Sequence, residues 1–188
     1  MSNPTIFLDI DGVLNSMEYA FLRMKKYQNS KIWGIDPYAI ERFQYIFEKV
    51  PDVEIVVSST WRKHYSMDEL KEVFTEAGFK YSDKIVGYTP SLFHDGNKFR
   101  GHEIKQYIQE HDIDNYVIID DSNDMLPSQR DRMVLTHNAS GITFDDVIEI
   151  IGILDPCNSF YVKNKSTCRG RLPIVMMNEM EGGYSYTE

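Results

Sequence analysis

The chain of 188 residues is 42% hydrophobic, which is enough for one domain with a substantial core. Its net charge of −9 argues against a protein whose whole surface follows a nucleic acid, although it allows a local basic site. The first residues lack the charged start and apolar centre of a signal peptide, and no apolar run reaches membrane length. We therefore expect a soluble, cytoplasmic protein. Its two cysteines, Cys157 and Cys168, do not have the spacing of a metal site.

The first predicted element is a short buried strand that ends in two acids. Three apolar residues at 6–8 precede Asp9, a second carboxylate follows at Asp11, and Gly12 ends the run. Side chains two apart on a strand share a face, so the two carboxylates should converge where the backbone turns. Ligands of open α/β sheets bind at the carboxyl ends of strands, and paired carboxylates there favour a hard cation such as Mg²⁺. The stretch predicts a catalytic pair.

Two other interpretations of this stretch explain less. A calcium loop needs an oxygen ligand at its fifth place and a Glu at its twelfth, but counting from Asp9 these are Val13 and Ala20. A helix cap at Asp11 or Asn15 is compatible with a catalytic pair. Capping alone does not explain why two acids follow directly after a buried strand.

Residues 16–36 are either a flap over the acids or a helix and loop with solvated basic side chains. The segment is too short for a separate domain. Its aromatic and basic members are Tyr19, Phe21, Arg23, Lys25, Lys26, Tyr27, Lys31 and Trp33.

From residue 37 onward, predicted helices and strands alternate. Apolar residues at helical spacing, with caps and breakers at the ends, predict helices over 37–50, 67–77, 101–111 and 143–154. Apolar runs predict strands over 53–57, 85–88, 116–119 and 133–135. Such alternation is typical of an α/β fold, a mainly parallel sheet with right-handed crossovers and helices on both faces.

We expect one domain over residues 1–155. The character of the chain changes at Pro156, and residues 156–188 form a tail that serves as an extra strand, a partner arm or a cover over the substrate. No segment between the motifs is long enough for a large cap domain, so we expect only residues 16–36 and 89–99 to screen the acids.

Polar groups also follow two later strands. The strand over 53–57 runs into Ser58 and Ser59, and the strand over 116–119 runs into Asp120 and Asp121. A basic residue lies between these two groups in the sequence, with Lys98, Arg100 and Lys105 as the candidates.

This order of groups resembles that of the haloacid dehalogenase-like (HAD) hydrolases. Residues 9–13 match their first motif, Asp-x-Asp-Gly-[Thr/Val], and Ser58, or in second place Ser59, matches the Ser or Thr of the second. The acidic pair at 120–121 matches the fourth motif, with Asp124 as a further candidate. The third motif usually supplies a Lys, and here the chain departs from the pattern.

A narrower resemblance accounts for this departure. Five short runs are similar to the HAD domain of bacterial and phage Swiss Army Knife RNA-repair proteins, and the likeness extends over residues 6–154. It implies a three-layer Rossmann-like HAD fold and Arg100 as the basic group, with Lys98 as the alternative. The runs are Ser-Thr-Trp-Arg, Gly-Tyr-Thr-Pro, Arg-Gly-x-Glu-Ile, Val-Ile-Ile-Asp-Asp and Gly-Ile-Thr-x-x-Asp.

The resemblance implies a role for each group. Asp9 attacks phosphorus to form an aspartyl-phosphate, and Asp11 protonates the leaving oxygen and later deprotonates water. Mg²⁺ is held by Asp9, the Asp11 backbone carbonyl, and Asp120 or Asp121.

The remaining candidates would hold the substrate. Ser58 and Arg100 bind the other phosphoryl oxygens. Ser59, Lys98 and Arg62 are further substrate-binding candidates, and Arg62 alternatively anchors Trp61 and the following helix.

The expected function is a magnesium-dependent phosphatase that acts on a nucleic-acid end or a free nucleotide. One alternative is a catalytically silent binding or regulatory module, whose signature, loss of Asp9 or Asp11, is absent from the sequence. Others are a small-molecule nucleotidase and phosphoryl transfer to an acceptor other than water. The sequence predicts no membrane partner and leaves the oligomeric state open.

Overall fold

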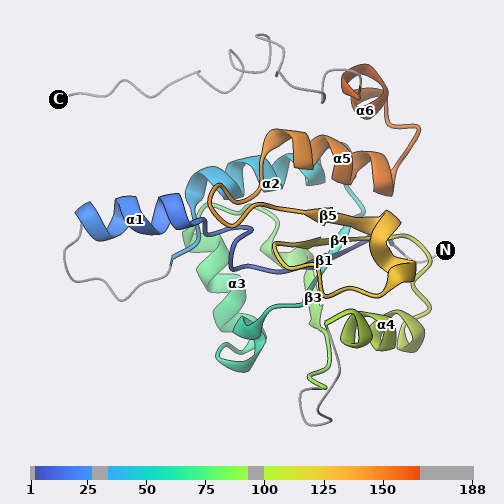
Figure 1. The fold of residues 1–188 in the computed structure, drawn as a ribbon, viewed down its shortest axis with the longest axis horizontal. Helices are drawn as coiled ribbons and strands as arrows, with labels where there is room; N and C mark the ends of the chain where they lie inside the picture. Colours follow the sequence, from blue (N-terminus) through green and yellow to red (C-terminus); the bar gives the residue numbers. More distant parts are fainter. Residues whose placement is uncertain (1–2, 27–33, 93–99, 166–188) are drawn as a thin grey trace.

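A five-stranded parallel sheet forms the centre of the protein. The computed structural model describes residues 3–26, 34–92 and 100–165. Within them the strand order is β3-β2-β1-β4-β5 (Figure 1). Each predicted strand agrees with an observed strand to within one residue at either end. The strands are β1 (Thr5–Leu8), β2 (Glu54–Val57), β3 (Ile85–Tyr88), β4 (Tyr116–Asp120) and β5 (Met133–Leu135).

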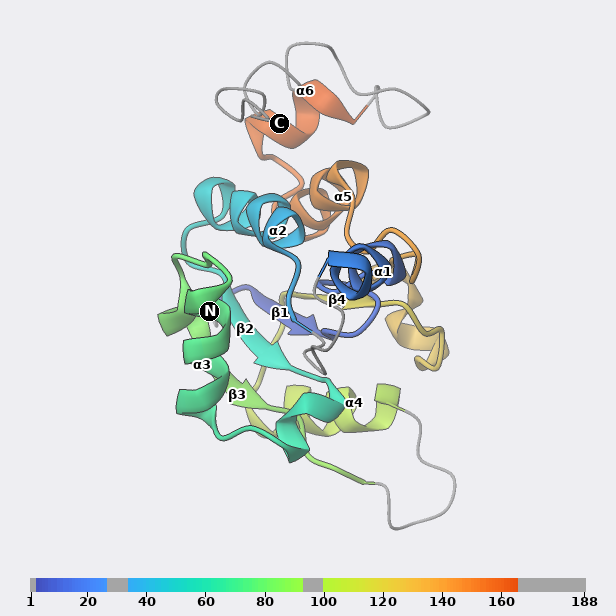
Figure 2. The same ribbon diagram turned by 90° about the vertical axis from the view of Figure 1, so that its left-hand side faces the viewer.

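Helices cover both faces of this sheet. In Figure 2, α2 and α5 lie together above it and α4 lies below. This three-layer arrangement confirms the predicted α/β, Rossmann-like fold with helices on both faces. The helices are α1 (Met17–Lys26), α2 (Pro37–Lys49), α3 (Met67–Glu76), α4 (Arg100–Glu110), α5 (Phe144–Leu154) and α6 (Ser159–Asn164), with short 3₁₀ turns η1 (Thr60–Lys63), η2 (Ser82–Lys84) and η4 (Pro127–Arg132).

Side-chain caps define where the main helices begin. The Asp36 carboxylate accepts a hydrogen bond from the second residue of α2. Reciprocal capping boxes start α3, between Ser66 and Glu69, and α5, between Thr143 and Asp146. These caps satisfy amides that have no partner inside the helix, so the loops that enter each helix have a defined path.

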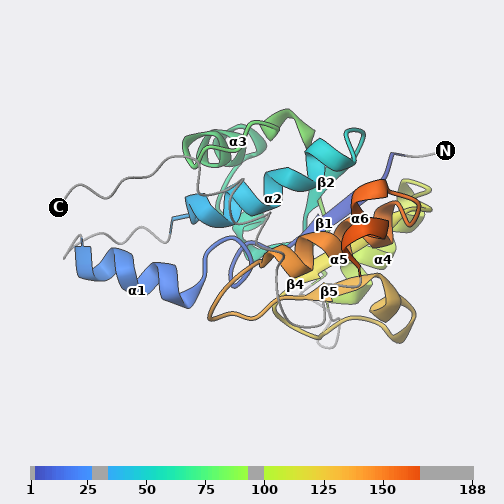
Figure 3. The same cartoon turned by 90° about the horizontal axis from the view of Figure 1, so that it is seen from above.

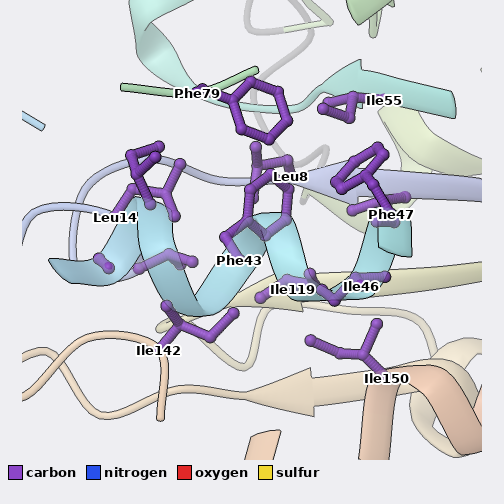
Figure 4. Close-up of a cluster of buried hydrophobic side chains, with 14 of the residues drawn as sticks. Leu8, Leu14, Phe43, Ile46, Phe47, Ile55, Phe79, Ile119, Ile142 and Ile150 are labelled. Carbon is purple, nitrogen blue, oxygen red and sulfur yellow. The ribbon is translucent and has the colours of Figure 1, made fainter. Parts of the chain in front are cut away.

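The main core lies on the face under α2 and α5. Side chains alternate along β1, so Ile6 and Leu8 enter this core while Phe7 enters a smaller cluster under α4. Aromatic rings from α2, from α3 and from the chain after α3 belong to this core, and Figure 4 shows those of Phe43, Phe47 and Phe79 beside the strands. Burial of one such phenylalanine stabilises the fold by about 1.5–3 kcal/mol. The rings are Phe43, Phe47, Phe74 and Phe79.

Residues 16–36 contain a helix, α1, and no large cap is present in the described part of this segment. In Figures 1 and 3, α1 extends beyond the sheet on the side where the chain leaves β1. The aromatic Tyr27 and Trp33 and the basic Lys31 of this segment lie outside the described residues. The flap interpretation therefore stays a prediction.

The packed part of the chain continues past residue 155, where we placed the end of the domain. Helix α6 follows, and its Tyr161 lies so close to Gly152 of α5 that a Cβ at this glycine would collide with the ring. Phe160 packs edge-on against Tyr45 of α2, with ring centroids 5.2 Å apart. Residues 166–188 of the predicted tail lie outside the described residues. Among the described helices, none has the length and apolar character to cross a membrane.

Candidate active site

The register of the sheet brings three strand ends to one level. Leu8 is opposite Val57 on one side and Ile119 on the other. The pairing continues one step beyond the strand, because the Asp9 amide donates to Ile119 at 2.9 Å and the Ser58 amide donates to Leu8 at 2.8 Å. The polar residues that follow these strands therefore meet at the carboxyl edge of the sheet, where α/β proteins bind ligands.

Three carboxylates converge at this edge. Asp9, Asp120 and Asp121 each offer an oxygen within 4.8 Å of the other two. Asp9 and Asp120 are 5% and 1% exposed, and Asp121 is half-buried. Hard oxygen donors at this spacing suit a divalent cation such as Mg²⁺, so the residues present fit the metal that the sequence predicts.

Gly12 makes room for this cluster. Its φ of +75° lies in the left-handed region, and a Cβ at this position would collide with the Asp121 carboxylate. The Gly12 carbonyl also accepts a hydrogen bond of 3.1 Å from the Thr136 hydroxyl, which follows β5. The glycine of the first motif is therefore required both for the turn and for the close approach of the fourth-motif acid.

Arg100 is the cation that the described residues bring to the acids. Its Nη1 lies 2.9 Å from an Asp9 oxygen and 2.6 Å from an Asp120 oxygen. Burial alone would lower the pKa of the guanidinium, but the charges of Asp9 and Asp120 outweigh it and raise the pKa above its ordinary value. Arg100 is therefore charged at all relevant pH values. Lys98, the alternative, lies outside the described residues.

Burial changes the acid–base properties of the two innermost carboxylates. Burial raises the pKa of Asp9, although Arg100 and hydrogen bonds from Ser59 and the Ile10 amide oppose the shift. Burial and the nearby charge of Asp9 together raise the pKa of Asp120 to about 7. Two like charges this close favour the binding of a proton or of a cation, which is the electrostatic character of a metal site.

The two serines after β2 have different partners. The Ser59 hydroxyl donates to Asp9 and accepts a hydrogen bond of 3.5 Å from the Trp61 amide. The Ser58 hydroxyl pairs with Thr89 at 3.4 Å, and both serines are fully buried. The sequence argument preferred Ser58 to Ser59 as the hydroxyl of the second motif. In the structure Ser59 is the one whose hydroxyl contacts Asp9. The assignment of phosphoryl binding to Ser58 or Ser59 stays a prediction.

Asp11 lies apart from the cluster of three carboxylates. Its exposed side chain accepts hydrogen bonds from the Trp61 indole, with Nε1 3.0 Å from both oxygens, and from Asn15, at 2.7 Å. The sequence argument placed Asp9 and Asp11 together by strand alternation, but β1 ends at Leu8, so alternation does not extend to Asp11. A metal contact through the Asp11 backbone carbonyl stays a prediction.

Arg62 connects the second and third motifs. Its guanidinium forms a buried ion pair with Glu103, with 2.6 Å between Nη2 and Oε2, and donates to the Ser59 carbonyl at 2.8 Å. The other Glu103 oxygen accepts a hydrogen bond of 2.9 Å from the Leu92 amide. These partners tie Arg62 to the turn after β2 and to α4. Substrate binding by Arg62 stays a prediction.

Asp124 caps the helix that carries Arg100. One carboxylate oxygen of Asp124 accepts a hydrogen bond of 3.4 Å from the Arg100 amide, and its carbonyl accepts from the Gly101 amide. It is not part of the three-carboxylate cluster. Capping at this helix end favours the conformation from which Arg100 reaches the acids.

The sequence argument gave no site role to Glu103 or Asn15. Glu103 lies within one of the matched runs, and Asn15 lies two residues after the first motif. Glu103 is part of the Arg-Gly-x-Glu-Ile run, one helical turn after Arg100. Asn15 lies four residues after Asp11 and was considered only as a cap. The partners of Asn15, Asp11 and Gly12, are only four and three residues away, so its spacing was an available signal. The partner of Glu103, Arg62, is 41 residues away, and no local pattern indicates that contact.

Comparison with known families gives the same assignment as the geometry. The family described as the HAD domain in Swiss Army Knife RNA repair proteins matches residues 5–147. The chain belongs to this family, which confirms the resemblance inferred from the motifs and identifies the domain as a HAD-type hydrolase fold. No curated protein and no solved structure was found to match the chain.

Proposed function

We propose that this HAD domain is a magnesium-dependent phosphomonoesterase whose substrate is the phosphorylated end of a nucleic acid. The observation that carries the proposal is the buried Asp9 beside Arg100 and two further acids at the carboxyl edge of the sheet. A carboxylate in this setting is a positioned nucleophile with a fixed positive charge next to it. Membership of an RNA-repair family supports the choice of substrate.

The proposed reaction has two steps. In the first, an Asp9 oxygen attacks phosphorus, the bond to the leaving oxygen breaks, and Asp11 gives that oxygen a proton. In the second, water attacks the phosphorus of the aspartyl-phosphate and passes its proton to Asp11, which frees Asp9 and releases phosphate. Arg100, which already bridges Asp9 and Asp120, supplies positive charge to the phosphoryl oxygens.

Asp9, Asp120 and Asp121 are the side chains that would hold Mg²⁺. When bound, the ion reduces the repulsion between an anionic nucleophile and an anionic phosphate. The raised pKa of Asp120, caused by burial and by the charge of Asp9, supports the same assignment because a cation would relieve this repulsion.

The described residues contain no cap domain that would exclude a large leaving group. Between β1 and α2, the described residues contain only α1 and short connections, and none of the described elements forms a second domain over the acids. A terminal phosphate on an extended chain could enter such a site. The net charge of −9 favours contact with a few terminal nucleotides over a long groove.

A competition assay tests the proposal. A terminally phosphorylated oligonucleotide should have a higher kcat/KM than the matching mononucleotide, and its advantage should shrink as salt is added. Both activities should require Mg²⁺ and Asp9. Preference for the mononucleotide without a salt effect would instead indicate a small-molecule nucleotidase. Absence of hydrolysis across nucleotides, sugar phosphates and phosphorylated oligonucleotides would indicate a silent binding module.

A further inference from the structure

The carboxylate of Asp11 is held by two donors from outside the metal cluster. The Trp61 indole Nε1 lies 3.0 Å from each Asp11 oxygen, and the Asn15 amide nitrogen lies 2.7 Å from one of them. Asp11 is otherwise exposed, so without these donors its side chain would rotate freely in solvent. Hydrogen bonds to a charged acceptor are the stronger kind, and two of them define its orientation.

The Trp61 donor is itself fixed in place. The indole is only 8% exposed and stacks on Tyr65, with ring centroids 5.2 Å apart and an interplanar angle of 23°. Its backbone amide donates to the Ser59 hydroxyl, the same hydroxyl that contacts Asp9. A buried indole N–H needs an acceptor, and Asp11 is the acceptor it finds. Trp61 therefore couples the acid Asp11 to the turn that follows β2.

The Asn15 amide has only one consistent orientation. Its oxygen accepts a hydrogen bond of 3.0 Å from the Gly12 amide, which can only donate. The amide nitrogen must therefore face Asp11, and Asn15 is 7% exposed, so the group has little freedom to turn away. This contact ties Asp11 to the same turn that accommodates Asp121.

We infer that Trp61 and Asn15 are positioning residues that hold the Asp11 carboxylate for proton transfer; the inference rests on the proposed phosphatase reaction. Both keep their own protons throughout, and the transferred proton passes only between Asp11, the leaving oxygen and water. An ionised carboxylate has roughly four acceptor sites, so the two donors leave room for the oxygen of the leaving group. A proton donor must be within hydrogen-bond reach of that oxygen, which requires a fixed carboxylate.

Two variants separate positioning from packing. Trp61→Phe keeps a planar ring beside Tyr65 and removes the N–H donor. Asn15→Asp keeps an acceptor for the Gly12 amide and replaces the donor to Asp11 with a like charge. Tyr65→Phe is the matched control, because it keeps the stacked ring and changes no contact to Asp11.

The activity assay compares an alkyl phosphate, a poor leaving group, with p-nitrophenyl phosphate, a good one. The quantity compared is kcat/KM, because it reports formation of the aspartyl-phosphate and not its hydrolysis, in which Asp11 serves both substrates alike. If the two residues act through Asp11, each variant should lose roughly 10- to 100-fold more kcat/KM on the alkyl phosphate, since only that leaving group depends on protonation. The double variant D11N/W61F should be no slower on the alkyl phosphate than D11N. Tyr65→Phe should lose little on either substrate.

A magnetic resonance measurement tests the contact without relying on activity. The indole N–H signal that is missing from the Trp61→Phe spectrum belongs to Trp61, and it should shift in Asp11→Asn because the acceptor loses its charge. An unmoved signal overturns the hydrogen bond itself. Equal losses on both substrates, or additive losses in the double variant, overturn the positioning role while the proposed function stands. Wild-type protein without Asp9-dependent hydrolysis overturns the proposed function, and the proton-transfer role with it.

Discussion

The face of the sheet under α2 and α5 is packed with aliphatic and aromatic side chains, whereas the face under α4 combines a small apolar cluster with buried charges. Phe43, Phe47 and Phe79 pack together on the first face (Figure 4). On the second face the buried apolar set is small, and the ion pairs of Arg62 and Arg100 lie beside it. The members of that set are Phe7, Val56, Ile104, Ile118 and Met125.

The difference shows how α4 is positioned. Apolar packing is non-directional and tolerates small shifts, but hydrogen bonds and ion pairs define position and angle. Glu103 binds Arg62, and the Gln129 amide donates to the Gly101 carbonyl at 2.9 Å. These polar links secure the first turns of α4, from which Arg100 reaches the acids. We therefore expect the broad face to control stability and the α4 face to control the site.

The largest effect should follow from Asp9→Asn, which removes the nucleophile from the charged face. Hydrolysis should fall by roughly 10⁴-fold or more, because the neutral amide cannot form the phosphorylated intermediate. The unfolding temperature should stay equal or rise, since the change also removes a charge that repels Asp120. Steady-state kinetics and thermal unfolding on the same preparation measure both. Near-native turnover of this variant would disprove the covalent mechanism.

Phe43→Ala, on the apolar face, should have the opposite result: stability should fall and activity should stay the same. Phe43 is fully buried, so its truncation should lower the free energy of unfolding by about 3–5 kcal/mol. The kcat of the remaining folded protein should be close to that of the wild type, because the ring lies in the apolar core under α2 and α5 and carries no group that takes part in the reaction. Urea unfolding provides the measurement. Glu48→Ala on the same helix is the control, since Glu48 is exposed and its loss should have little effect.

Glu103→Gln tests the polar links of α4 directly. Removal of the charge leaves Arg62 buried without its ion-pair partner, which should lower the free energy of unfolding by roughly 1–3 kcal/mol. The KM should rise because the helix that carries Arg100 loses a directional contact. Glu110→Gln, at the exposed end of the same helix, is the matched control and should leave both quantities unchanged. A KM equal to that of the wild type would show that apolar packing alone positions α4.

A further effect should come from pH in the absence of divalent ions. The pKa of Asp120 in the folded protein is raised to about 7 by burial and by Asp9, above its ordinary value of 3.8. A raised carboxyl pKa contributes stability below the unfolded value, and this contribution is lost as pH rises from 3.8 through about 7. Asp120→Asn should not show this loss, so the stability of wild type relative to this variant should fall over that range. Thermal unfolding of both proteins across pH measures the difference, and a constant difference would contradict the prediction.

Local patterns in the sequence were enough to predict the layers of the fold. The strands β3 and β5 were predicted with their observed bounds, and helix α3 with its start at Met67. Alternation, helical periodicity and capping act over a few residues, so each can be identified without knowledge of the rest of the chain. Three of the four acids predicted at strand ends, Asp9, Asp120 and Asp121, converge for the same reason, because parallel strands end at one edge of the sheet.

Tertiary structure alone decided which side chains meet around those acids. Trp61 and Asp11 are 50 residues apart in the sequence, and Arg62 and Glu103 are 41 apart. Whether Ser58 or Ser59 turns towards Asp9 depends on the course of the chain after β2, which ends at Val57. Contacts of this kind depend on the packing of whole elements against one another, and no local pattern records that packing. The sequence by itself therefore determined the elements and the acids at their ends, while the folded chain determined how Asp11 and Arg100 are held.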